Sequence, residues 1–395
     1  MRPRTVLSME QALSLSYGTL RLAQLGWRVI RLEPAPRPGQ KTPGDPNRYV
    51  GLPAAGPDRR SYYLAPNVGK EAIALDLKSE EGRQLLRRIV KDLPVDVFAS
   101  NTLPRRYADL GIDYETLSAL NPNLIWIGVS AMGPDYPDMP GYDPALQALL
   151  GYMDITGQAD GPPTLSGVPM IDLKAGDEVF AQTMRAVAEQ AEGKKGARID
   201  VSMARAAVSW LQTTLPLLDL GATPEDVRRS GNEHREFVPV NVYQTADSWI
   251  YIAIGNDVQW RRLTKLAPFR SLAREKRETN EGRRQDRRAI HDELATAVWA
   301  HGTADLLPLL QGAGIVAYPV HSIGDVRDLP GIREHLNVTR LPDGREVRLP
   351  PAAVETERRE FSLSPQYGEH TRAVLEQTGL TGDEIDGLMS EGVVL

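Results

Sequence analysis

The chain has 395 residues, a formal net charge of −6 and no cysteine. This length exceeds the size at which one hydrophobic core usually keeps growing, so we expect two structural units. The mild acidity argues against a general nucleic-acid-binding protein, and the lack of cysteine excludes disulfides, thiolate metal sites and a thiol nucleophile. The six histidines are scattered without ligand spacing, so no metal site is predicted.

The N-terminal half alternates between predicted strands and helices. Strands are predicted at 5–8, 28–32, 95–99, 124–129 and 198–201, and helices at 14–25, 79–90, 114–120 and 173–189. This alternation predicts a large, Rossmann-like α/β domain with a parallel sheet. The proline- and glycine-rich segment 34–57 is expected to be a long loop on the side where strand ends meet, where ligands usually bind.

The second half of the chain has a different rhythm. Ser202 is expected to cap an apolar helix at 203–220, after which residues 221–239 form a polar linker. Residues 240–255 alternate as a β-hairpin and begin a smaller α+β domain. The expected division is a large domain at 1–220, a linker at 221–239, a small domain at 240–325, and a linker with a return to the large domain at 326–395.

Further expectations concern the end of the chain. Helices are predicted at 290–300 and 303–311, two short helices within 362–395, and returning segments at 315–320 and 341–351. The strongly basic segment 270–288 is interpreted as a solvated face, with contact to a polyphosphate as the alternative.

Membrane and nucleotide motifs are not found in the sequence. Glu10 and Gln11 interrupt any apolar secretion-signal segment, and no run of about 18 apolar residues occurs, so a soluble, cytoplasmic protein is expected. No dinucleotide-binding glycine motif and no P-loop motif occurs. Leu165-Ser166-Gly167 lacks the first glycine of a nucleophile elbow, which disfavours a serine hydrolase.

The segment from Thr156 to Gly176 contains the strongest candidate for chemistry, Asp172. Residues 168–171 are expected to form a short buried segment that delivers Asp172 to a helix start. Backbone N–H groups and the helix dipole favour an ionised carboxylate there by roughly 0.3–1 kcal/mol. An ionised carboxylate in a partly dry pocket can act as a nucleophile. From these residues alone, Asp172 is either a helix cap or a nucleophile.

Ten segments, in the same order along the chain, carry a resemblance to a known family. They are LAQLGWRVIRLEP (22–34), GDPNR (44–48), NVGKEAIALDLKSEEG (67–82), LNPNLIWIGVSAMGP (120–134), PGYDPALQALLG (140–151), TGQADGPPTLSGVPMIDLKAG (156–176), GARIDVSM (196–203), DSWIYIAIGNDVQW (247–260), GIVAYPVHSIGDV (314–326) and YGEHTRAVLEQTGL (367–380). With them the chain resembles the family III CoA-transferases, which include formyl-CoA transferase and carnitine CoA-transferase and are related to α-methylacyl-CoA racemases.

The resemblance implies a function and an assembly. Asp172 stands at the position of the family's catalytic aspartate, which forms an aspartyl acyl anhydride and then an aspartyl-CoA thioester. The substrates would be an acyl-CoA thioester and a small carboxylate, with no permanently bound cofactor. The family also implies an interlocked homodimer, with no nucleic-acid or membrane partner.

The resemblance also assigns binding residues. Leu75 and Lys78 would line the adenine and phosphate end of CoA, and Asn101 and Thr102 would form a CoA-contacting loop. Tyr142 and Asp143 match substrate positions near the thioester, with Tyr142 also on the CoA side. From the residue itself, Tyr142 is equally compatible with a core tyrosine.

The chain also departs from the family pattern. Ser14-Leu15-Ser16 replaces Ala-Gly-Pro, Asp109 replaces a cationic CoA contact, and no glycine-rich loop precedes Val242. These differences disfavour an oxalate-specific enzyme, so we expect a small carboxylic or dicarboxylic acid acceptor and a donor such as succinyl-CoA. A racemase or epimerase is an alternative, although the phenol of Tyr142, with a pKa of about 10, is a poor base. A non-catalytic acyl-CoA-binding protein is another.

Overall fold

The structure is a computed structural model that describes residues 3–37, 39–354, 356 and 358–395. The chain forms two compact units. The first contains the described residues up to Leu150, Ser166–Pro216 and Gly331–Leu395, and the second contains Gly151–Leu165 and Leu217–Pro330. The boundaries expected from the sequence concern domains that fold independently, and they stay a prediction.

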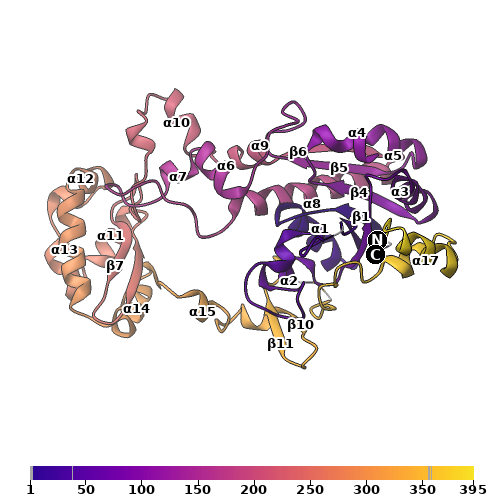
Figure 1. Cartoon of the computed structure of the whole chain (residues 1–395). Helices are drawn as coiled ribbons and strands as arrows, with labels where there is room; N and C mark the ends of the chain where they lie inside the picture. The colour runs from indigo at the N-terminus through magenta and orange to yellow at the C-terminus, as the bar shows by residue number, and fades with distance from the viewer. Residues whose placement is uncertain (1–2, 38, 355, 357) are drawn as a thin grey trace. The chain divides into compact units, whose positions relative to one another are not determined.

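A six-stranded parallel sheet organises the first unit (Figure 1). Its strands are β1 (Thr5–Met9), β2 (Arg28–Pro34), β3 (Glu71–Leu75), β4 (Val95–Ser100), β5 (Ile125–Ser130) and β6 (Ala197–Ser202). The spatial order β3-β2-β1-β4-β5-β6 reverses between β1 and β4, as in doubly wound nucleotide-binding folds. The predicted Rossmann-like fold is confirmed, and β3 is a strand that the sequence reading missed.

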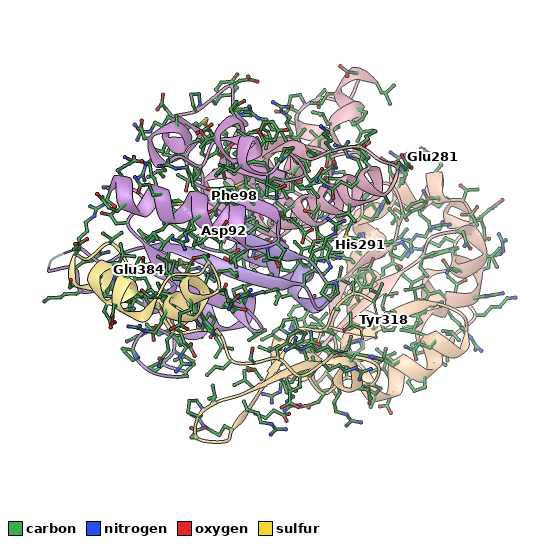
Figure 2. The ribbon with its side chains drawn as sticks, turned by 90° about the vertical axis from the view of Figure 1, so that its right-hand side faces the viewer. Asp92, Phe98, Glu281, His291, Tyr318 and Glu384 are labelled. Atoms are coloured by element: carbon green, nitrogen blue, oxygen red, sulfur yellow. The ribbon has the colours of Figure 1, made fainter. Side chains whose placement is uncertain are left out.

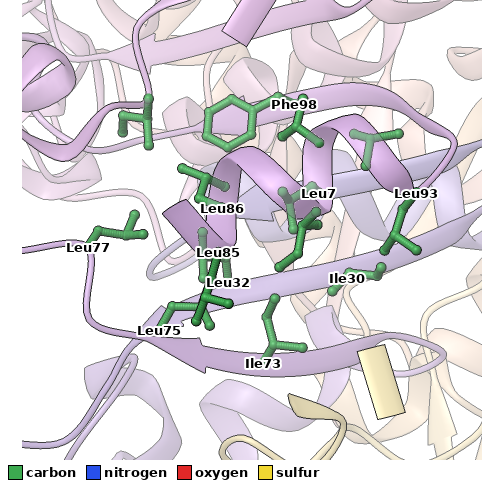
Figure 3. Packing of buried hydrophobic residues seen from close by; sticks show 14 of the residues in the cluster. Leu7, Ile30, Leu32, Ile73, Leu75, Leu77, Leu85, Leu86, Leu93 and Phe98 are labelled. Carbon is green, nitrogen blue, oxygen red and sulfur yellow. The ribbon is translucent and has the colours of Figure 1, made fainter. Parts of the chain in front are cut away.

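One face of this sheet is covered by α3 (Glu80–Asp92), which packs on side chains of β1 to β4 (Figure 3). Other elements that join this core are α4 (Tyr107–Leu110), α5 (Tyr114–Leu120), α16 (Thr371–Glu376) and α17 (Gly382–Ser390). Ser79 caps α3, since its hydroxyl accepts a 3.0 Å hydrogen bond from the N–H of Gly82. The end of the chain therefore completes the core of the N-terminal sheet.

Helices α1 (Ser14–Gln24) and α8 (Met170–Ala191) pack closely against each other at two glycines. A Cβ on Gly176 would lie 2.7 Å from the carbonyl oxygen of Ser14, and one on Gly18 would lie 3.0 Å from the carbonyl oxygen of Gly176. The first distance is too short for a side chain, and the second could be accommodated only if the neighbouring helix shifted. The two glycines therefore allow the backbones to approach, which fixes the first turn of α8 beside the start of α1.

A fully buried cluster of three cations and three carboxylates ties the long loop after β2 to the sheet. The salt bridges join Arg31 to Glu10 (3.2 Å) and to Asp45 (3.0 Å), Arg48 to Glu33, and Lys70 to Glu10 (2.7 Å). Each charge is compensated, as burial requires. Asp45 also accepts a 3.3 Å bond from the N–H of Ala12, which has a left-handed φ of 56°. The cluster therefore holds the turn between β1 and α1.

The apolar helix expected at 203–220 is interrupted. The structure has α9 (Met203–Val208) and then α10 (Leu215–Asp219). Pro216 explains the break, because proline within a helix removes a donor and its ring clashes with the carbonyl of the residue four positions earlier. Pro216 instead occupies the first turn of α10, where proline is tolerated. Ser202 caps α9 as predicted, by accepting from the N–H of Arg205.

The second unit contains a three-stranded antiparallel sheet in the order β7-β8-β9. The predicted hairpin is confirmed as β7 (Val240–Gln244) and β8 (Trp249–Ala253). The expectation that 315–320 returns to the large domain is wrong, because β9 (Val316–Pro319) pairs with β8. Helices of the second unit are α11 (Asp257–Leu263), α12 (Asn280–Gln285), α13 (Arg287–Trp299) and α14 (Thr303–Gly312).

The basic segment 270–288 is not simply a solvated face. Arg277 and Arg283 are fully buried. Arg277 binds Asp286 at 2.6 Å and Glu293 at 2.8 Å, and Arg283 binds Asp257 at 2.8 Å. A guanidinium can be buried when carboxylates and carbonyls satisfy its fork of donors. These arginines therefore connect α11, α12 and α13 rather than offering a surface to phosphate.

Buried polar contacts also occur on α13. His291, labelled in Figure 2 with Tyr318 of β9, lies in a largely buried position where its Nδ1 is 2.7 Å from the hydroxyl of Tyr243. Burial lowers the pKa of this histidine below its usual range. The ring is therefore a structural, neutral partner of Tyr243.

The remaining elements are short. They are α2 (Ser61–Asn67), α6 (Asp143–Leu149), α7 (Tyr152–Ile155), α15 (Ile323–Val326), β10 (Asn337–Arg340) and β11 (Glu346–Leu349). Within the described ranges, no helix combines the length and apolar character that crossing a membrane demands.

Candidate active site

A cavity of about 790 Å³ lies in the first unit, at the carboxyl ends of the parallel strands. Its wall includes Met9 at the end of β1 and the residues that directly follow, and Asn101 and Thr102 after β4. These two strands flank the point where the strand order reverses, which is where doubly wound sheets bind ligands. The volume falls within the range of small-molecule and cofactor sites.

The cavity brings together residues that are far apart in the sequence. Six of the seven predicted site residues line it, namely Leu75, Lys78, Asn101, Thr102, Tyr142 and Asp172. Asp143 is not among the lining residues. Ser14, at one of the positions where the chain departs from the family pattern, lines it as well.

The residues near the ends of β3 and β4 differ in what they offer the cavity. Leu75 is fully buried, whereas Lys78 is exposed at the wall. The side-chain amide of Asn101 is occupied, because it donates to the carbonyl of Gln11 (2.8 Å) and accepts from its N–H (3.0 Å). Asn101 therefore joins the turns that follow β1 and β4.

Tyr142 immediately precedes α6 and is 73% exposed. The alternative of a core tyrosine with a satisfied hydroxyl is therefore wrong. Its ring stands on the wall of the cavity, where a bound molecule can contact it.

Asp172 lies in the first turn of α8, but the local structure differs from the expected one. The helix begins at Met170 rather than at residue 173, and Val168 is 54% exposed, so only Ile171 of the expected buried segment is buried. The helix starts after Pro169, whose ring leaves no side-chain cap. Asp172 is half-buried, and no hydrogen bond from its side chain is formed with any described residue.

The helix start does not stabilise the ionised form of Asp172 as expected. The N–H groups of Ile171 and Asp172 donate instead to Oδ2 of the buried Asp143, at 2.7 Å and 3.2 Å. Burial first, and the charge of Asp143 second, raise the pKa of Asp172 to about 7. The helix-cap role belongs to Asp143, and Asp172 is free to point into the cavity.

Cationic residues on the cavity wall were missed by the sequence reading. Arg37 follows β2, and Arg106 lies in the turn after β4, so that with Lys78 three cations face the cavity. Asp109, where the family has a cationic contact, is not on the wall, and Arg106 stands one turn earlier. Both arginines could have been predicted from their positions in the sequence, since each follows the carboxyl end of a strand, where ligands bind in such sheets.

Metal chemistry is not supported by the described residues, because no group of three or more His, Asp or Glu side chains among them could hold a metal ion. The ionisable groups on the cavity wall are three carboxylates, one tyrosine and three cations, and of the carboxylates Glu33 is buried and paired with Arg48, whereas Asp76 and Asp172 are half-buried. Such a set can hold a polyanionic ligand while a carboxylate attacks it.

The fold is that of a doubly wound α/β protein, and its cavity is lined by cationic side chains and by the carboxylate of Asp172. A model of CoA-transferase family III matches residues 2–371. The chain belongs to this family, and it is therefore a CoA-transferase.

Relatives with named activities align over most of the chain. A protein named succinate–glutarate CoA-transferase from Agrobacterium fabrum is 31% identical, with 94% of each chain covered. A protein named acetyl-CoA:oxalate CoA-transferase from Acetobacter aceti is 33% identical, with 82% of each chain covered. The crystal structure of a CAIB/BAIF family protein from Brucella suis superposes with a TM-score of 0.81 at 29% identity, covering 95% of this chain and 98% of that one.

Proposed function

We propose that the protein transfers CoA from an acyl-CoA donor to a small dicarboxylic acid, with Asp172 as the nucleophile. The observation that carries this proposal is the state of Asp172, a half-buried carboxylate on the cavity wall without a side-chain hydrogen bond to any described residue. A carboxylate that is neither neutralised by a cation nor capped by donors keeps its lone pairs available for attack.

The reaction consists of four exchanges at three carbonyl carbons, those of the donor, of Asp172 and of the acceptor. A carboxylate oxygen of Asp172 attacks the thioester carbonyl of the donor, the C–S bond breaks, and CoA thiolate leaves an aspartyl acyl anhydride. The thiolate attacks the aspartyl carbonyl, which releases the donor acid as a carboxylate and leaves an aspartyl-CoA thioester. The acceptor carboxylate then attacks this thioester and expels the thiolate. Attack of the thiolate on the acceptor carbonyl gives the new acyl-CoA and restores Asp172.

Water must be excluded because the anhydride would otherwise hydrolyse. Apolar side chains form part of the cavity wall, among them Leu75, Val129 and Met203. The three cations Arg37, Lys78 and Arg106 would bind the phosphates of CoA, and Leu75 would pack near its adenine. Tyr142 would lie near the thioester.

The substrate class follows from the relatives' names. Two of them are named for the transfer of CoA to or from glutarate and oxalate, which are dicarboxylates. Succinyl-CoA is the proposed donor, as a protein from mouse that is 29% identical is named succinyl-CoA:glutarate CoA-transferase. Racemisation and non-catalytic acyl-CoA binding are the alternatives that an assay must separate from transfer.

An obligate homodimer is part of the proposal. The stretch 210–237 exposes large apolar side chains, namely Trp210, Leu215, Leu218, Leu220 and Phe237. Such exposure is unusual on a protein that works alone and is typical of an interface. Sedimentation at decreasing concentration tests it, because an obligate dimer has no stable folded monomer. A dilute monomer with native circular dichroism would contradict it.

Two measurements test the activity. Incubation with acyl-CoAs and free dicarboxylic acids, read by mass spectrometry, should yield a new CoA ester, whereas loss of chirality or binding without turnover would indicate the alternatives. Acyl-CoA given without acceptor and followed by hydroxylamine should leave a hydroxamate on Asp172 and not on Asp177, which lies on the same helix. An unmodified Asp172 in a protein that still turns over would refute its role.

A further inference from the structure

The carboxylate of Asp143 occupies an unusual place behind the cavity wall. It belongs to α6, is 3% exposed, and its Oδ2 accepts from the N–H groups of Ile171 and Asp172 on α8. Its Oδ1 accepts a 2.6 Å bond from the amide of Gln147. The other end of that amide accepts a 3.1 Å bond from the N–H of Ser166. These three donors hold the carboxylate of Asp143 in place.

This arrangement takes the first-turn donors of α8 away from Asp172. A carboxylate in the first turn of a helix normally benefits from free N–H groups. Here those groups are occupied by Asp143, so Asp172 is left with neither a hydrogen bond from a described residue nor a neighbouring cation. A carboxylate that accepts fewer hydrogen bonds is a better nucleophile because less solvation is lost on attack.

The other charged groups near this helix start are engaged elsewhere. On α1, Tyr17 and Arg21 face Asp177; on α8, Lys174 pairs with Glu178; on α9, Arg205 faces Asp135. Of the groups packed around Asp172, Asp143 is the charged one that acts on it. Asp143 and Asp172 therefore form a pair of like charges. The carboxylate of Asp143 accepts three hydrogen bonds, whereas that of Asp172 accepts none from a described residue.

We propose that Asp143 is a positioning residue for the attack by Asp172. Resting on the proposed function, the inference is that Asp143 fixes the first turn of α8 and raises the energy of the ionised Asp172 by repulsion. This repulsion is relieved when the charge of Asp172 passes to the departing CoA thiolate, so it favours acylation. Asp143 itself does not touch the substrate, because it does not line the cavity.

The test measures CoA release in a single turnover against pH, for the full-length protein. In Asp143→Asn one acceptor oxygen remains for the helix N–H groups, but the charge is gone. The acid limb of the profile should move to lower pH by about one unit, and the rate at its plateau should fall about tenfold. Asp143→Ser provides a second neutral replacement, which avoids placing an amide N–H opposite that of Gln147.

Gln147→Leu is the matched control, since it removes a bond to Asp143 but keeps its charge. Its acid limb should stay at the wild-type position even if its stability falls. If the Asn and Ser variants keep the wild-type limb and plateau rate per folded molecule, or if the Leu control shifts equally, the positioning role is refuted. Hydroxylamine labelling of wild-type Asp172 separates this inference from the proposed function. If Asp172 is not labelled, its role as the nucleophile is refuted. If Asp172 is labelled but the acid limb of the Asp143 variants stays at the wild-type pH, only the inference about Asp143 is refuted.

Discussion

Two groups of buried acids lie near the same cavity, and their surroundings differ. Beneath the loop after β2, Glu10 and Glu33 each contact a cation, and although burial tends to raise the pKa of both, Arg31 and its neighbours hold both pKa values below the usual range. At the start of α8, Asp172 has no cation and its pKa rises to about 7. Burial is common to both places, so the presence or absence of a cation accounts for the opposite directions of the pKa values.

The comparison also shows how the cavity is built. The paired cluster anchors Asp45, which holds the left-handed turn at Ala12 on the cavity wall. Buried charges are costly unless paired, so such a cluster suits a position whose task is to be rigid. An unpaired carboxylate with a raised pKa is typical of functional sites, which agrees with the role proposed for Asp172. Substitutions at Asp172 and in the paired cluster should therefore have different effects.

The largest effect is expected at the unpaired carboxylate. Asp172→Asn should lower CoA transfer roughly 10⁴-fold or more, because an amide cannot form the anhydride. Stability should change by no more than about 1 kcal/mol, since Asp172 does not cap the helix. Transfer is measured by mass spectrometry and stability by urea unfolding, with Asp177→Asn on the same helix as control. An Asn variant that melts far earlier while keeping turnover per folded molecule would show a structural role.

Breaking the paired cluster should affect stability instead. Arg31→Met keeps most of the volume but leaves Glu10 and Asp45 buried without this cation, which should cost about 3–5 kcal/mol in the free energy of unfolding. Urea unfolding measures it. Arg372→Met, which removes the exposed partner of Asp386, is the control and should leave stability close to that of the wild-type protein, because solvent screens an exposed pair. If Arg31→Met has the same free energy of unfolding as the wild-type protein, the salt bridges of Arg31 do not contribute to stability.

Asp172 and the paired acids Glu10 and Glu33 should have opposite effects on how stability depends on pH. Since Asp172 must be ionised to attack, transfer should rise from pH 5 to 8 with a midpoint near 7. Its raised pKa means that the folded state binds the proton more tightly, so this contribution to stability is present at low pH and lost as pH rises through 7. Glu10 and Glu33, with lowered pKa values, contribute stability that is lost as pH falls below their usual range of about 4.5. Activity and unfolding of wild type and Asp172→Asn across pH 4–9 check both slopes.

The smallest effect is expected at the cavity cations. Arg106→Ala should raise KM for acyl-CoA about fivefold with little change in kcat, because an exposed cation contributes about 1 kcal/mol to phosphate binding. Arg105→Ala is the matched control, since Arg105 is adjacent, pairs with Asp138 and does not line the cavity. Equal effects of both variants would indicate general electrostatics rather than a binding site.

Periodicity and turn chemistry were sufficient to predict much of the fold. Strand and helix alternation identified β1, β2, β4, β5 and β6, since apolar runs between turn signals are local features. The short segment 71–75 was missed because its five residues resemble many other apolar runs, and only pairing with β2 makes it a strand. The break in 203–220 follows from Pro216, a local signal that was overlooked.

The resemblance to a family predicted Asp172 and five other residues of the cavity wall, because these positions carry distinctive motifs. What the sequence could not give was which acid receives the helix N–H groups. Asp143 and Asp172 are 29 residues apart along the chain, and only folding brings the carboxylate of one to the backbone of the other. Likewise, Arg31, Arg48, Arg277 and Arg283 are buried because carboxylates elsewhere in the chain pair with them, which composition alone does not reveal. The pKa and the burial of a charged side chain therefore depend on the residues around it, and only the tertiary structure decides which residues these are.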